Sequence, residues 1–223
     1  MTCIRILRLL RGLALLALAT APGMAPAQAA FGGPSPYPSL FGSQELRSAD
    51  LSLFPKWRGA LARHFAETGL ANAPCSSASF NLCHLAEWTR FLDGLRGIDP
   101  MHQIRAVNGF LNRRGYVIDP HNYGVSDYWA SPRQFLSLDG DCEDYAIAKY
   151  FSLRALGFAS ESMRIVVLQD LNLGTAHAIL VVYIGGRALV LDNQVPTVVD
   201  ARAIGHYQAI YSINERHWWL HRL

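Results

Sequence analysis

The chain has 223 residues, of which 51% are hydrophobic and 17% are charged, with 20 basic and 17 acidic residues. This composition suits one domain with a substantial core and leaves little room for a second. The small positive balance gives no reason to expect a nucleic-acid-binding protein.

Residues 1–29 are typical of a secretory signal peptide. Arg5, Arg8 and Arg11 form a positively charged N-terminal region, and residues 12–19 are continuously apolar. The Ala-Gln-Ala at 27–29 supplies a cleavage site with small residues. The apolar run is far shorter than the roughly 20 residues that span a bilayer, and no later segment is long enough either. We expect export with cleavage near Ala29, no membrane span in the mature form, and a mature chain with 17 basic and 17 acidic residues.

The segment 30–44 is rich in Gly, Pro and Ser and is predicted to be a flexible leader. The residues from 45 to 223 are predicted to form a single domain. Its first half shows apolar residues at helical spacing in three segments, 43–69, 81–95 and 99–116, the first of them interrupted near Pro55. Asp99 followed by Pro100 marks the start of the third helix.

A loop-rich stretch leads to a further predicted helix that contains Cys142 and ends at Gly157. The pattern then changes to that of β-strands, with predicted strands at 163–170, 176–184, 187–193 and 207–214. Helices followed by a run of antiparallel strands indicate an α+β domain.

The cysteines divide into a predicted bridge and one remaining thiol. Cys3 is removed with the signal peptide, and Cys75 and Cys83 lie in a polar, turn-forming stretch of an exported protein, which favours a local disulfide. A zinc site of these two with His84 is an alternative, but it lacks a fourth ligand at recognisable spacing. By count, Cys142 is then the unpaired thiol.

The position of Cys142 is suitable for a nucleophile, but its neighbours oppose that role. It lies in the first turn of the predicted helix, with Gly140 and Asp141 as the cap, and a helix N-terminus lowers the pKa of a thiol. The carboxylates of Asp141, Glu143 and Asp144 raise it unless a cation neutralises them, and hard oxygen ligands favour Ca²⁺. The alternative is that these acids simply interact favourably with the helix dipole.

A histidine and an aspartate are predicted to meet across a β-hairpin. Two consecutive glycines at 185–186 are a strong signal for a two-residue turn, which pairs residues whose numbers sum to 371. His177 then faces Gln194, and Asp192 lies diagonally on the same sheet face, within reach of an imidazole–carboxylate hydrogen bond. A buried, hydrogen-bonded histidine without a catalytic role is the alternative interpretation of His177.

These residues together resemble a known family. The stretch DYWASPRQFLSLDGDCEDYAIAKYFSLRALG, followed by HAILVV and LVLDNQ, is similar to the bacterial transglutaminase-like cysteine proteinases of the LapG type, over nearly all of the mature chain. The resemblance implies a papain-like, transglutaminase-like core, in which N-terminal helices and a catalytic helix pack on an antiparallel sheet. It implies Cys142, His177 and Asp192 as the catalytic triad.

The resemblance also implies a cofactor, a location and partners. The family pattern puts Ca²⁺ on Asp141 and Glu143, with Asp144 as a further candidate. Family members are periplasmic, and the LapG type cleaves a large surface adhesin in its N-terminal region, which disperses biofilm. An inner-membrane receptor that responds to cyclic-di-GMP holds such enzymes inactive.

Several alternatives stay open at the level of sequence. The thioester intermediate of such an enzyme can be intercepted by an amine, so acyl transfer competes with hydrolysis, and a non-catalytic protein-binding module is a third interpretation. Trp129 is either an oxyanion donor or a core residue. His217 and His221 are either a metal pair on a helix or packing residues.

Overall fold

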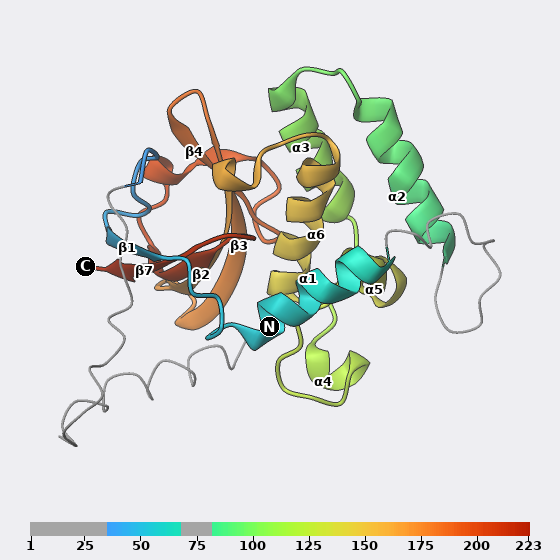
Figure 1. The fold of residues 1–223 in the computed structure, drawn as a ribbon, viewed down its shortest axis with the longest axis horizontal. Coiled ribbons are helices and arrows are strands. Elements are labelled where there is room, and N and C mark those ends of the chain that lie inside the picture. The colour runs from blue at the N-terminus through green and yellow to red at the C-terminus, as the bar shows by residue number, and fades with distance from the viewer. Residues whose placement is uncertain (1–34, 68–81) are drawn as a thin grey trace.

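The computed structural model describes residues 35–67 and 82–223. An antiparallel sheet occupies one side of the molecule and the helices gather on the other (Figure 1). The predicted α+β class is therefore confirmed. The predicted signal peptide and Cys75 lie outside the described residues, and within the described part no helix has the length and apolar character needed to cross a membrane.

The sheet has seven strands in the order β1-β7-β6-β2-β3-β4-β5, and all neighbours in it are antiparallel. The strands are β1 (Gln44–Ser48), β2 (Met163–Asp170), β3 (Thr175–Ile184), β4 (Arg187–Leu191), β5 (Val199–Asp200), β6 (Tyr207–Ile213) and β7 (Trp218–Arg222). The helices are α1 (Pro55–Glu67), α2 (Leu82–Leu95), α3 (Pro100–Leu111), α4 (Asp119–Asn122), α5 (Pro132–Leu138) and α6 (Cys142–Ala155), with short 3-10 turns at Ser160–Ser162 and Ala201–Ala203.

Helix α6 is the central element of the fold. Every residue from Cys142 to Leu153 is buried, because α3 and α5 cover one side of the helix while β2 and β3 pack against the other. A helix covered on all sides has no solvent-facing polar stripe. It ends as predicted before Gly157, whose φ of 97° is the left-handed conformation that glycine adopts at the end of a helix.

The hairpin of β3 and β4 has the predicted register. Ile184 pairs with Arg187, and Leu180 pairs with Leu191. Gly185 and Gly186 have φ values of 56° and 72°, as a tight turn of this hand requires. This turn brings the start of β3 next to the end of β4.

Two segments near the chain ends differ from the expectation. Residues 44–48 form the edge strand β1 rather than part of a helix, because Pro55 occupies the first turn of α1 and the helix starts there. The segment around His217 and His221 is not helical, so the metal pair on a helix is wrong. His221 lies in β7, buried between the hydroxyl groups of Ser43 and Ser212.

Residues 35–43 of the predicted leader lie against the sheet on the face opposite the helices. The side chain of Leu40 is fully buried there, and Tyr37 stacks on Tyr183 with 4.6 Å between ring centroids. This part of the leader therefore adds apolar cover to the outer face of the sheet.

Candidate active site and metal centre

Cys142 is the first residue of α6 and its side chain is 1% exposed. Asp141 occupies the N-cap position, and the sulfur lies 3.2 Å from Oε2 of Glu143. The sequence-predicted thiol, its cap and its acidic neighbour are therefore at the buried start of the central helix.

The turn that leads into Cys142 is held from a distant part of the chain. Asp139 has a φ of 61°, which is strained for a residue other than glycine, and its carboxylate lies 2.6 Å from the guanidinium of Arg114. The N–H of Val117 donates to the carbonyl of Gly140 at 3.0 Å. These contacts fix the backbone immediately before the nucleophile candidate.

Asp144 has a structural task that the sequence did not reveal. Its Oδ1 accepts a hydrogen bond from the N–H of Ala130 at 2.7 Å, and its Oδ2 accepts from the N–H of Asp141 at 3.4 Å. The carboxylate thus closes the start of α6 and ties it to the segment before α5. It lies outside the group of carboxylates that could hold a metal.

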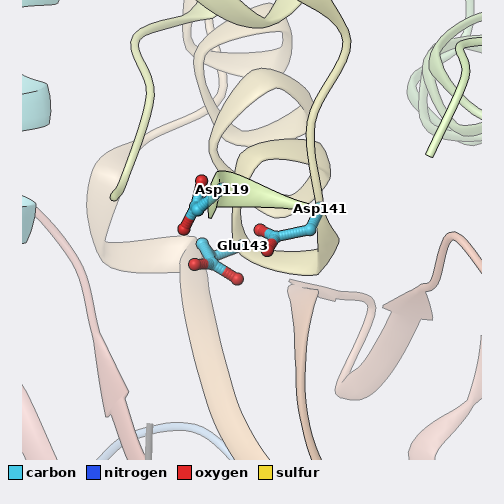
Figure 2. Close-up of side chains that lie close together, drawn as sticks. All are labelled: Asp119, Asp141 and Glu143. Atoms are coloured by element: carbon cyan, nitrogen blue, oxygen red, sulfur yellow. The ribbon is translucent and has the colours of Figure 1, made fainter. Parts of the chain in front are cut away.

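That group consists of Asp119, Asp141 and Glu143, all buried, with one oxygen from each within 4.8 Å of the others. Figure 2 shows the three carboxyl groups gathered around a common space beside the start of α6. Asp141 and Glu143 are the predicted ligands, and Asp119 joins them from α4.

In the absence of a cation, burial and mutual repulsion disfavour the ionised form of all three carboxyl groups. Burial and the charge of Asp141 raise the pKa of Asp119 to about 7, and burial raises that of Asp141 to about 6. Burial, together with the charges of Asp141 and Asp144, also raises the pKa of Glu143 well above its ordinary value. A cation between the groups would remove this repulsion.

The oxygen atoms of the cluster fit a hard cation. Oδ1 of Asp119 and Oδ1 of Asp141 are buried, and neither has a hydrogen-bond partner among the described residues. The second oxygen of Asp119 is already used, since it accepts from the N–H of Tyr128 at 2.5 Å. Buried carboxylate oxygens left without donors are the ligand type that Ca²⁺ takes.

Sequence patterns do not point to Asp119, because the contact that makes it a candidate ligand is not local. It stands 22 positions before Asp141 in a stretch that reads as loop, and its place before Pro120 suggests only a helix start. A bridge between Tyr116 and Gly140 brings the two segments together. No motif or periodicity in the sequence predicts that contact.

His177 and Asp192 form the predicted pair. Nε2–H of His177 donates to Oδ1 of Asp192 at 2.9 Å, and both side chains are 1% exposed. Nδ1 is then the ring nitrogen left to accept a proton, and the amide of Gln194 lies 3.4 Å from it. The geometry orients the imidazole as a base requires.

Three further groups that the sequence did not reveal hold Asp192. The N–H of Gln194 donates to Oδ1 at 2.8 Å, and the hydroxyl of Tyr207 donates to Oδ2 at 2.7 Å. The side-chain amide of Asn112, at the end of α3, donates to the carbonyl of Asp192 at 2.7 Å. Burial raises the pKa of Asp192, but the hydrogen bond and charge of His177 and the hydrogen bonds from Tyr207 and Gln194 outweigh this effect and bring the pKa below its ordinary value.

Cys142 and His177 come from α6 and β3, two elements that pack against each other. In this structure Cys142 is disulfide-bonded, so the expectation from the cysteine count, that its thiol is unpaired, does not hold. A nucleophile needs the reduced form, because the thiolate is the reactive species.

Trp129 lies in the core. It is 4% exposed, and its ring packs edge-on against that of Trp57 with 6.4 Å between centroids. These contacts match the packing interpretation of Trp129, and an oxyanion role for it stays a prediction.

Comparison with known proteins assigns the chain to a family. A family model described as bacterial transglutaminase-like cysteine proteinase matches residues 93–221. The chain belongs to this family and is a cysteine peptidase, which confirms the family resemblance. No curated protein matches the chain.

Solved structures of a protein from Legionella pneumophila are similar to the chain. The calcium-bound structure of LapG is 34% identical with a TM-score of 0.60, and the match covers 70% of this chain and 86% of that one. An EGTA-treated structure of LapG is 30% identical with a TM-score of 0.58, and the match covers 74% and 86%. These likenesses support the predicted LapG-type core.

Proposed function

We propose that this cysteine peptidase is a Ca²⁺-dependent endopeptidase of the periplasm, with Cys142, His177 and Asp192 as its catalytic triad. The observation that carries the proposal is the buried hydrogen bond of 2.9 Å between Nε2 of His177 and Oδ1 of Asp192, in a chain of this peptidase family. A histidine held in this tautomer by a carboxylate is the base that activates a thiol.

In the proposed reaction, Nδ1 of His177 takes the proton from the reduced thiol of Cys142. The thiolate attacks the carbonyl carbon of a peptide bond, and the imidazolium then gives its proton to the departing amine. Water, losing a proton to His177, hydrolyses the thioester and restores the thiol. Asp192 stays ionised and stabilises the imidazolium.

The start of α6 supplies a donor for the tetrahedral intermediate. The first N–H groups of a helix point out of its N-terminus, and the N–H of Cys142 belongs to the first residue of α6. Backbone N–H groups held rigidly in this way stabilise a developing oxyanion.

Asp119, Asp141 and Glu143 are the proposed ligands of Ca²⁺, two of them expected from sequence and one added by the fold. Bound there, Ca²⁺ would neutralise the carboxylates that otherwise oppose a thiolate at Cys142. Support comes from the two buried oxygens, on Asp119 and Asp141, that have no hydrogen-bond partner among the described residues, and from the similarity to a calcium-bound LapG.

The proposed substrate is a large surface adhesin, cleaved near its N-terminus, and the proposed partner is an inner-membrane regulator that responds to cyclic-di-GMP. Both rest on the LapG-type resemblance. The predicted signal peptide at 1–29 supports a periplasmic location.

The test compares the mature chain with its Cys142→Ala variant on a candidate adhesin fragment, in the presence of a reductant. We expect wild type with CaCl₂ to cleave the fragment and Cys142→Ala to be slower by roughly a millionfold, hence below detection. EGTA should abolish cleavage by wild type, and excess CaCl₂ should restore it. Cleavage is measured by mass spectrometry of the products.

Cys83→Ala is the matched control, because Cys83 is an exposed cysteine at the start of α2, and this variant should cleave as wild type does. Cleavage that persists in Cys142→Ala would end the nucleophile proposal. Activity indifferent to EGTA would remove the calcium proposal and leave the triad standing. A fluorescent primary amine in the assay distinguishes transfer from hydrolysis, since only transfer attaches it to the product.

A further inference from the structure

The second oxygen of Asp192 has a partner from a strand that is not its neighbour. Tyr207 begins β6, which β2 and β3 separate from β4 in the sheet. Its hydroxyl nevertheless donates to Oδ2 of Asp192 at 2.7 Å, while Oδ1 accepts from His177. The carboxylate is therefore held from both sides.

The ring of Tyr207 is fixed independently of Asp192. It is 5% exposed, and it lies edge-on to His177 at 6.1 Å and edge-on to Phe41 at 5.8 Å between centroids. Its backbone pairs with Asp170 in the ladder between β6 and β2. The position of the hydroxyl is thus fixed by the packing of the ring and by the backbone of β6.

The hydroxyl keeps its role as a donor. Burial and the neighbouring charge of Asp192 raise the pKa of Tyr207 above its ordinary value, so the phenol stays protonated. An ionised carboxylate can only accept hydrogen bonds. The direction of the bond is therefore fixed.

We propose that Tyr207 is a positioning residue of the catalytic site: by holding Oδ2 of Asp192, it keeps Oδ1 directed at Nε2 of His177. The inference rests on the proposed function, because it assigns a role to that triad. Without the Tyr207 hydroxyl only Oδ1 is held, by His177 and by the N–H of Gln194, so the carboxylate can turn about its last side-chain bond and orients the imidazole less firmly. Without Tyr207 the ring spends less time with Nδ1 ready to take the thiol proton.

The test measures the reactivity of Cys142 in reduced protein with iodoacetamide, which needs no identified substrate. The rate of alkylation is followed on the Cys142 peptide by mass spectrometry. Tyr207→Phe removes only the hydroxyl and keeps the ring between His177 and Phe41. We expect the alkylation rate to fall about tenfold, as partial loss of a general base predicts.

Tyr183→Phe is the matched control. Tyr183 is a buried tyrosine on the same face of the sheet, and its hydroxyl has no hydrogen-bond partner among the described residues. This variant should react within about twofold of wild type. If Tyr207→Phe reacts as Tyr183→Phe does, or only lowers the unfolding temperature, Tyr207 is a structural residue and the inference is overturned.

Tyr207→Phe leaves the buried charge of Asp192 with one donor fewer, and this variant could fail to fold. A second pair of variants then tests the inference. In the Asp192→Asn background, adding Tyr207→Phe should change the alkylation rate by less than about twofold, because the carboxylate through which Tyr207 acts is gone. A further tenfold fall in that background would overturn the inference.

Failure of the proposed function gives a different result. If His177→Ala leaves the alkylation rate of Cys142 at the wild-type value, no imidazole activates this thiol, and both proposals end. If His177→Ala is slow and Tyr207→Phe is not, the triad stands and only the role of Tyr207 is refuted.

Discussion

At the scale of single residues, three aspartates gathered around the start of α6 have different tasks. Asp144 gives both oxygens to backbone N–H groups, whereas Asp141 and Asp119 each keep a buried oxygen that has no donor among the described residues. The number of N–H groups that reach a carboxylate decides whether it stabilises the backbone or is left to bind a cation.

This difference leads to a prediction about Asp119. Asp119→Asn should weaken Ca²⁺ binding by about tenfold or more, because affinity follows the charge and number of the ligands. Isothermal titration with CaCl₂ measures the change. Asp99→Asn, at the exposed N-cap of α3, is the control and should bind as wild type does. An Asp119→Asn protein with unaltered affinity would show that Asp119 is not a ligand.

At the scale of elements, α6 can begin where it does because Gly140 precedes it. A Cβ atom at this position would lie 2.2 Å from Oδ2 of Asp144 and 2.8 Å from its Cβ, both far inside contact distance. Only glycine lets the carboxylate of Asp144 fold back over the start of the helix.

Gly140→Ala should therefore lower the free energy of unfolding by about 2–3 kcal/mol, as overpacking of a tight site does. Urea unfolding at neutral pH gives the value. Gly109→Ala is the control, because Gly109 lies inside α3 with open space where the Cβ would be, and it should raise stability by about 0.5–1 kcal/mol. Equal effects of the two substitutions would refute the steric argument.

At the scale of the whole molecule, a buried histidine joins β7 to the segment before β1 and to β6. Both ring nitrogens of His221 in β7 are hydrogen-bonded, Nδ1 to Ser43 at 2.7 Å and Nε2 to Ser212 at 2.9 Å. Burial and the nearby charge of Arg164 lower the pKa of His221 to about 3, although Glu45 lies 3.9 Å away. The folded protein therefore holds this histidine neutral.

Stability should consequently depend on pH through His221. In the unfolded chain this histidine takes up a proton below about pH 6.5, whereas the folded chain does so only near pH 3. His221 alone should make the free energy of unfolding fall by about 1.4 kcal/mol per pH unit as pH decreases through this window, whereas Asp119 and Asp141, whose pKa values are raised, contribute in the opposite direction. Urea unfolding at pH 7.5 and 5 measures the slope.

His221→Gln should remove this contribution to the slope, even if its stability at pH 7.5 is lower than that of wild type. His102→Gln, at an exposed position in α3, should retain the wild-type slope. Identical slopes in wild type and His221→Gln would contradict the assignment.

Much of the fold and part of the site could be predicted from short-range signals. Asp99 and Pro100 start α3 as expected, and the glycines at 185–186 set the register that brings His177 to Asp192. Hydrogen bonds in turns and caps join residues a few positions apart, so the sequence carries their pattern directly.

The contacts that complete the site depend on tertiary packing. Asp119 reaches the metal cluster through the bridge of Tyr116 with Gly140, and Tyr207 reaches Asp192 from a strand that is not adjacent. The strand β1 forms because β7, at the other end of the chain, offers it a partner. Such contacts depend on how the buried helix α6 and the sheet pack together, and packing joins residues whose separation along the chain leaves no periodic or local signal.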